Sequence, residues 1–169
     1  TVVVDSPWVD PAMQAILDDL ARAPAVDLRT LPIDEARRTF ERQQAPWVWS
    51  AEPMAESRDL TIPGPAGPIR ARLHRPVAEA GAPVILFIHG GGWTFGSIDT
   101  HDGTMRSLAT ASGAAVLGID YRLSSDTAFP GPLDDVMAAL AFIETGGLGN
   151  ACDPSRIAVS GDSAGANLA

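Results

Sequence analysis

The stretch that decides the fold is Val84-Ile85-Leu86-Phe87-Ile88-His89-Gly90-Gly91-Gly92-Trp93, in which five apolar residues are followed by a histidine and three glycines. A short, continuous apolar run is typical of a strand that is buried on both faces of a sheet. The glycines come at the carboxyl end of this strand, where α/β proteins place their ligand sites. They indicate that another group closely approaches the backbone at this point.

The regions on either side of this strand predict an α/β fold. Apolar runs at 114–120 and 156–160 indicate two more buried strands, and helical patterns near 100–112 and 132–144 lie between them. On the N-terminal side, alternating polar and apolar residues flank the turn-rich PGPAGP at 63–68, which predicts an antiparallel hairpin. We therefore expect a mostly parallel sheet that begins with an antiparallel hairpin and carries helices on both faces.

The first fifty residues show helical patterns and no strand pattern. Asp10 before Pro11 is typical of an N-cap followed by proline at the first helical position, and apolar residues then recur at helical spacing through 11–22. A second helix is predicted from Ile33 to Gln44, with acids in its first turn as the helix dipole prefers. We expect 1–50 to form a helical cap segment, distinct from the α/β portion at 51–169.

Composition excludes several classes of protein. The chain has 169 residues, 46% hydrophobic and 20% charged, as in a globular domain. Its net charge of −9 and the scatter of its 12 Lys and Arg argue against nucleic acid as a partner. Cys152 is the single cysteine, so no intrachain disulfide is expected. No apolar segment is long enough for a membrane span and no leader pattern is seen, so a cytoplasmic location is the default expectation.

The strand at 156–160 runs directly into Gly161-Asp162-Ser163-Ala164-Gly165, a G-x-S-x-G pentapeptide. After a buried strand, this pattern predicts a sharp turn into a helix, with a strained serine backbone and an exposed hydroxyl. The flanking glycines let the strand and the helix approach closely. Without such a strand the pentapeptide is weak, because it also occurs in ordinary loops. Here it makes Ser163 the candidate nucleophile.

The glycines after the first strand fit the same chemistry. Attack on an ester carbonyl places negative charge on an oxygen, and fixed backbone N–H groups stabilise that charge best. Gly91 and Gly92 are candidates for two of these donors, and Ala164 for the third, so the three form the predicted oxyanion hole. A phosphate-binding loop is not supported, because the segment 92–97 lacks the required lysine.

With these residues in view, the chain resembles a family. HGGGW at 89–93, DYRL at 120–123 and GDSAG at 161–165 look like the motifs of the hormone-sensitive-lipase-type carboxylesterases of the α/β-hydrolase fold. The resemblance covers the chain from about residue 8 onward. It implies serine esterase activity on short to medium acyl esters, a small-molecule ester as partner, no cofactor or metal, and an N-terminal cap. One departure is Ser124-Ser125-Asp126, where relatives usually have Ala-Pro-Glu; Asp126 is a candidate replacement for that acid.

A serine nucleophile needs a base, and all three histidines precede Ser163. His74 alternates with Arg70 and Arg72 on a strand, so we expect it on a solvated surface. His89 is expected to brace the glycine loop. His101 is expected at a helix N-terminus capped by Asp99 or Thr100, with ordinary solvation. None is expected to be the base, because the hydrolase fold takes its histidine from beyond the nucleophile.

Four acidic residues have structural explanations. Asp134 and Asp135 begin a predicted helix, where capping or a salt bridge is favoured over catalysis. Asp162 is too close to Ser163 to orient a distant histidine. Asp120, just past a strand, is either a loop anchor or a support of the site. Because the hydrolase fold places its acid and then its histidine after the serine, we expect neither of them among these residues.

Only six residues follow Ser163, so we expect this chain to be the first part of a longer hydrolase. One flank of the strand at 156–160 should then lack a neighbour. A non-catalytic small-molecule-binding protein on the same scaffold is the alternative, and a complete molecule of poor solubility is a third possibility. Homo-oligomerisation is left open.

Overall fold

The structure is a computed structural model that describes residues 8–22, 26–48 and 52–169. Its helices are α1 (Pro11–Arg22), α2 (Ile33–Gln44), α3 (Asp102–Ser112), α4 (Gly131–Glu144) and α5 (Ala164–Leu168), with short 3-10 helices at Leu28–Thr30, Ala45–Trp47 and Gly149–Ala151. Its strands are β1 (Glu56–Gly64), β2 (Gly67–Arg75), β3 (Ala82–Ile88), β4 (Ala115–Ile119) and β5 (Cys152–Gly161). No helix in these described ranges is both long and apolar enough to cross a bilayer.

The chain divides into two compact units, Thr1–Leu31 and Pro32–Ala169. In the first, α1 has the predicted bounds, and the Asp10 carboxylate caps it by accepting the Ala12 N–H at 2.8 Å. In the second, α2 also has the predicted bounds. The functional boundary that we place at residue 50 stays a prediction.

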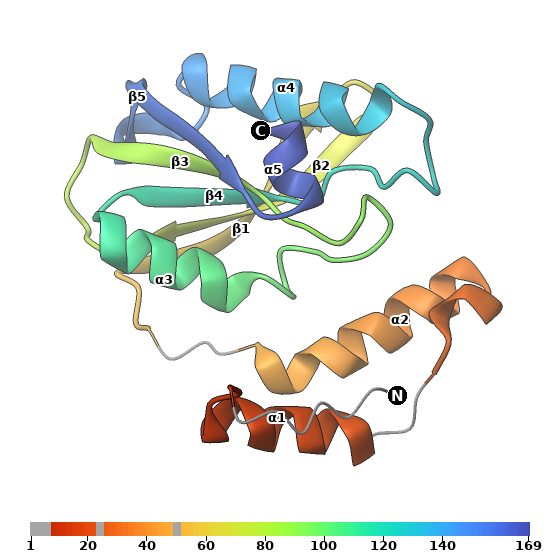
Figure 1. Cartoon of the computed structure of the whole chain (residues 1–169). Coiled ribbons are helices and arrows are strands. Elements are labelled where there is room, and N and C mark those ends of the chain that lie inside the picture. Colours follow the sequence, from red (N-terminus) through yellow and green to blue (C-terminus); the bar gives the residue numbers. More distant parts are fainter. Residues whose placement is uncertain (1–7, 23–25, 49–51) are drawn as a thin grey trace. The chain divides into compact units, whose positions relative to one another are not determined.

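The second unit contains one mixed sheet in the order β1-β2-β4-β3-β5. The antiparallel hairpin β1-β2 pairs through β2 with β4, and β4, β3 and β5 run parallel (Figure 1). The predicted α/β class and the predicted hairpin are confirmed. Strand β3 lies between its two parallel neighbours, so its carboxyl end is at the centre of the parallel part.

Successive side chains of a strand point to opposite faces of the sheet, so the apolar side chains of a buried strand must be covered on both faces. Helices provide this cover here. Helix α3 lies on one face, and α4 and α5 lie on the other (Figure 1). Leu86 and Ile88 of β3 belong to the core cluster that includes Val136 of α4, whereas Phe87 packs in the cluster with Met105 of α3. Full burial of one such side chain contributes roughly 1.5–3 kcal/mol. These two layers hold β3 firmly and fix the position of the loop that follows it.

Strand β5 forms one edge of the sheet. In the part of the chain that the structure describes, it pairs with β3 alone, as expected from the sequence. Val159 of this strand is exposed. The edge therefore has free backbone hydrogen-bonding groups on one side.

Candidate active site

The site lies at the topological switch point of the sheet, where successive crossovers run to opposite sides of β3. From β3 the chain crosses to β4 on one side, and from β4 it crosses back over β3 to β5 on the other. The first crossover contains α3 and the second contains α4, on opposite faces (Figure 1). In an open α/β sheet such a reversal leaves a crevice outside the carboxyl ends of the strands, which is the usual ligand position.

A hydrogen bond joins the two loops that leave β3 and β5. Ile88 is paired with Gly161 at the ends of these parallel strands. Beyond that pair, the Gly90 N–H donates to Asp162 Oδ1 at 2.8 Å. The glycine loop and the G-x-S-x-G turn therefore lie next to each other at one edge of the sheet.

The glycine loop has a backbone that side chains would not permit. Gly91 has φ 125°, and a Cβ added there would overlap the Phe95 carbonyl oxygen. The carbonyl of Gly91 accepts the Phe95 N–H at 2.9 Å and closes a tight turn. Trp93 has φ 55° without being glycine, so this turn is strained at a second position. The loop therefore has a defined conformation that requires glycine at position 91.

The predicted strained bend at the serine is confirmed. Ser163 has φ 50° and ψ −117°, a conformation that costs a non-glycine residue on the order of 1–3 kcal/mol. Ser163 immediately precedes α5, and it is exposed. Gly161 and Gly165 pack against the backbone of β3, since a Cβ at either position would overlap the Ile88 carbonyl oxygen. The close approach of strand and helix thus requires both glycines.

The three predicted oxyanion donors have uncommitted amides. Among the described residues, the backbone N–H groups of Gly91, Gly92 and Ala164 donate no hydrogen bond to another protein group. Two of them belong to the loop after β3, and the third lies at the start of α5 next to Ser163. The structure thus places Ser163, Gly91, Gly92 and Ala164 around the ends of neighbouring strands.

His89 has the bracing role that we expected. It is buried, its Nδ1 lies 2.8 Å from the Gly90 carbonyl oxygen, and its ring stacks on Tyr121 with centroids 4.5 Å apart. Burial lowers its pKa from the ordinary value, so the neutral ring can donate from Nδ1 to the carbonyl. The Tyr121 hydroxyl donates to the His89 carbonyl at 2.9 Å. Both contacts hold the base of the glycine loop.

The DYRL segment also supplies structural contacts. Asp120 is a loop anchor, because its Oδ1 accepts the Ile98 N–H at 2.7 Å. Asp135 is buried and accepts from both the Arg122 guanidinium and the Arg122 N–H. The structural salt bridge expected for Asp135 is confirmed.

Asp126 forms an ion pair at the position where the sequence departs from the family motif. Its Oδ2 accepts from Arg37 Nη2 of α2 at 2.8 Å. Arg37 Nε also donates to the Thr94 carbonyl of the glycine loop at 3.1 Å. Arg37 therefore links α2 to two loops at the carboxyl edge of the sheet. No pattern in the sequence suggested this contact.

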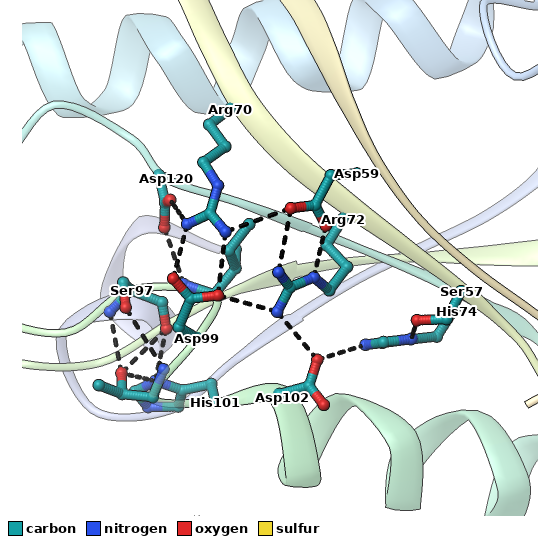
Figure 2. Close-up of polar contacts among 12 residues, drawn as sticks. Ser57, Asp59, Arg70, Arg72, His74, Ser97, Asp99, His101, Asp102 and Asp120 are labelled. Atoms are coloured by element: carbon teal, nitrogen blue, oxygen red, sulfur yellow. Dashed lines mark hydrogen bonds and ion pairs between the residues drawn. The ribbon is translucent and has the colours of Figure 1, made fainter. Parts of the chain in front are cut away.

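The expectation that His74 lies on a solvated surface is wrong. Its side chain is fully buried, with Nδ1 2.8 Å from Ser57 Oγ and Nε2 3.0 Å from Asp102 Oδ1 (Figure 2). At His74 the polar face of β2 is covered, because Asp102 at the N-terminal end of α3 lies against the ring, whereas Arg70 on the same face is exposed. Arg72, between them, pairs with Asp59 and Asp102. The polar alternation correctly marked one face, but it did not show that the His74 end of that face is buried.

Ser57, His74 and Asp102 have the residue types of a catalytic triad but lie away from Ser163, on β1, β2 and α3. Ser57 sits in a paired strand, directly opposite His74, where the backbone amides point along the sheet and do not converge above the hydroxyl. The Arg106 guanidinium also donates to Ser57 Oγ, at 3.3 Å. We interpret the group as a buried structural network.

This network should make stability depend on pH. Burial lowers the pKa of His74 and of His89 from the ordinary value of 6.5. The unfolded chain then binds more protons than the folded chain near and below pH 6.5, so the unfolding free energy should fall as the pH drops from 7.5 to 5. Urea unfolding across this range measures it. In His74→Gln the decrease should be smaller, and an equal decrease in both proteins would contradict the assignment.

The expected capping of α3 is also wrong. His101 itself is the N-cap residue of α3, without a side-chain capping bond. Asp99 is instead held by Arg70 and Arg72, and Thr100 Oγ1 accepts the Ser97 N–H at 2.9 Å. Arg70 and Arg72 of β2 bind the Asp99 carboxylate, so this carboxylate does not cap α3. His101 is also largely shielded, with 18% of its side chain exposed, so it lacks the ordinary solvation that we expected.

Comparison with known proteins identifies the family. The model of the alpha/beta hydrolase fold matches residues 85–169, and the chain belongs to this family. The resemblance to hormone-sensitive-lipase-type carboxylesterases, based on the motifs, is confirmed by the most similar relatives. The chain is 36% identical over 168 residues to Esterase LipI of Mycobacterium tuberculosis, covering 98% of this chain and 51% of LipI. It is 37% identical over 177 residues to Carboxylic ester hydrolase LipN of the same organism, covering 99% and 45%.

Solved structures agree with this family. The chain superimposes on the hyperthermophilic esterase of the archaeon Pyrobaculum calidifontis with a TM-score of 0.87 and 38% identity, covering 95% of this chain and 51% of that one. It thus spans about half the length of the relatives that it matches.

Proposed function

We propose that the protein is a serine carboxylesterase that hydrolyses short to medium acyl esters through an acyl-enzyme intermediate. The Ser163 hydroxyl attacks the ester carbonyl, and the N–H groups of Gly91, Gly92 and Ala164 stabilise the oxyanion. The alcohol leaves, and water then releases the acid from the acyl-serine.

One observation carries this proposal. An exposed serine in a strained backbone conformation lies beside a rigid glycine loop, and three amides near it have no partner among the described residues. Preorganised donors of this kind stabilise developing charge without reorganisation. The names of the relatives, which are esterases or ester hydrolases, support ester hydrolysis as the reaction class.

The general base is proposed to lie outside these residues. His74 contacts Ser57 and Asp102, His89 contacts Gly90, and Nε2 of His101 faces Asp162. We therefore assign the triad histidine and its acid to the part of the protein that corresponds to the second half of the relatives. The alternative of a non-catalytic binding protein is not favoured by those relatives.

Covalent labelling tests the assignment of the nucleophile. The protein expressed from its complete reading frame is treated with a fluorophosphonate, which forms a bond from phosphorus to an activated serine oxygen and releases fluoride. Mass spectrometry should place the phosphonyl group on the peptide that contains Ser163. Ser160, three residues earlier on β5, provides the matched control. Labelling should persist in Ser160→Ala and be lost in Ser163→Ala; a label elsewhere, or none, would contradict the proposal.

A further inference from the structure

We propose that His101 is a positioning residue, which holds the Asp162 carboxylate in place and through it orients the glycine loop relative to Ser163. The inference rests on the proposed function. It begins with a shared acceptor: Asp162 Oδ1 accepts the Gly90 N–H at 2.8 Å and lies 3.3 Å from His101 Nε2. The histidine therefore contacts the group that joins the two loops of the site.

Asp162 is connected to both halves of the site. Its carboxylate holds Gly90, which precedes Gly91, and its main-chain carbonyl accepts the Gly165 N–H at 2.8 Å on the other side of Ser163. The carboxylate fits closely against the loop, since a Cβ on Gly90 would overlap it. A shift of this side chain would therefore move the donors and the nucleophile relative to each other.

The Asp162 side chain needs a second restraint. It is 49% exposed, so one hydrogen bond to a backbone amide must compete with water and with its other rotamers. Nε2 of His101 is the side-chain donor on its other side. A hydrogen on Nε2 makes the contact attractive, and a charged acceptor strengthens the hydrogen bond.

His101 is itself rigid. Its Nδ1 lies 2.9 Å from Thr100 Oγ1 and 3.2 Å from the Ser97 carbonyl oxygen (Figure 2). Its ring lies against those of His89 and Phe87, with centroids 5.5 Å and 6.1 Å away. Thr100 has one hydroxyl hydrogen, and two acceptors lie 2.9 Å from Oγ1, the Ser97 carbonyl oxygen and His101 Nδ1. We assign this hydrogen to Nδ1, so that Nε2 carries the ring hydrogen that faces Asp162.

The segment that carries His101 is anchored to the sheet. Asp120 Oδ1 accepts the Ile98 N–H at 2.7 Å, and Asp99 accepts from Arg70 of β2 at 2.8 Å (Figure 2). The imidazole is thus supported by β2, β3 and the loop after β4. Its Nε2 faces the Asp162 carboxylate, so the anchored imidazole restrains that side chain. The contact of Nε2 is therefore with Asp162 and not with Ser163.

The expected effect is on turnover. Loss of the Nε2 contact should let Asp162 move, so that Gly91 and Ser163 are less often in the productive arrangement. A displacement of about 1 Å can cost up to about 10²-fold in rate. Because Asp162 keeps its bond to Gly90, we expect a decrease in kcat of about tenfold, with KM changed by less than about twofold.

Three substitutions separate this role from simple packing. His101→Phe keeps the aromatic ring and removes both nitrogens. His101→Gln can place an amide nitrogen near the Nε2 position, and His101→Asn, its matched control, reaches only the Nδ1 position. In the full-length protein, kcat for a short nitrophenyl ester should fall about tenfold in the Phe and Asn variants and recover by at least half in the Gln variant. Equal kcat for Asn and Gln, or an unchanged kcat in Phe, would overturn the proposal.

A double-mutant cycle tests the route through Asp162. Asp162→Ala removes the carboxylate that Gly90 and His101 share. In that background His101→Phe should have no further effect on kcat; an effect of the original size would overturn the proposal. The Gly90 amide NMR resonance provides a readout without catalysis, and His101→Phe should shift it. If the wild-type protein has no Ser163-dependent hydrolysis, the proposed function fails, while an unshifted Gly90 resonance would refute the positioning contact by itself.

Discussion

Ser163→Ala is expected to lower kcat for a short nitrophenyl ester on the order of 10⁶-fold, because the proposed acyl intermediate forms on the Ser163 oxygen. The hydroxyl is presented by a bend that follows β5, and alanine keeps that backbone while it removes only the oxygen. Turnover at substrate saturation, measured on the full-length protein, checks the expectation.

The fold should survive this substitution. Ser163 is exposed and lies between two segments held by β3, so its side chain contributes little to packing. The melting temperature should change by only a few degrees, on the order expected for about 1 kcal/mol or less. Ser160→Ala on β5 should retain full activity. Substantial hydrolysis by Ser163→Ala would mean that another nucleophile acts, and the esterase mechanism proposed here would be wrong.

Gly91→Val is expected to reduce kcat by about 10²–10³-fold, the usual cost of losing one oxyanion donor. Gly91 has φ 125°, which a β-branched residue strongly disfavours, and its Cβ would overlap the Phe95 carbonyl oxygen. The loop must therefore shift, and the amide of residue 91 moves from the position that we propose for an oxyanion donor. Hydrolysis of a short nitrophenyl ester measures the loss.

A matched glycine distinguishes lost catalysis from lost stability. Gly113 has φ 70° at the C-terminal end of α3, and a Cβ there would meet nothing within 4 Å. Gly113→Ala introduces a side chain at another position of positive φ, at the opposite end of this helix from His101, with a smaller backbone strain than valine at position 91. It should lower the melting temperature without changing kcat. Unchanged turnover in Gly91→Val would remove Gly91 from the oxyanion hole.

Buried apolar runs made the parallel strands predictable from sequence. The run that ends at Ile88 forms β3, and the pairing of β3 with β5 follows from the family's fold as much as from the strand pattern. The start of β5 was less predictable. It begins at Cys152, before the predicted residue 156, because Cys152 pairs with Ala82 across a shift in register. Such a pairing depends on the neighbouring strand, which a local pattern does not contain.

Polar contacts between distant segments were the least predictable part. Arg37 and Asp126 are 89 residues apart, and His74 and Asp102 are 28 apart, so no spacing rule connects either pair. The alternation at Arg70, Arg72 and His74 showed which side chains share a face. It could not show that Asp102 of α3 would lie against His74, because that contact arises only from the tertiary packing.

The fit of Gly161 and Gly165 against the Ile88 carbonyl bears on how such proteins are found in genomes. These two glycines are needed because the backbone of another strand, more than seventy residues upstream in the sequence, packs against them. A screen for the pentapeptide alone would collect many surface loops. A screen that also requires an apolar strand ending in histidine and glycines would select chains in which that contact can form.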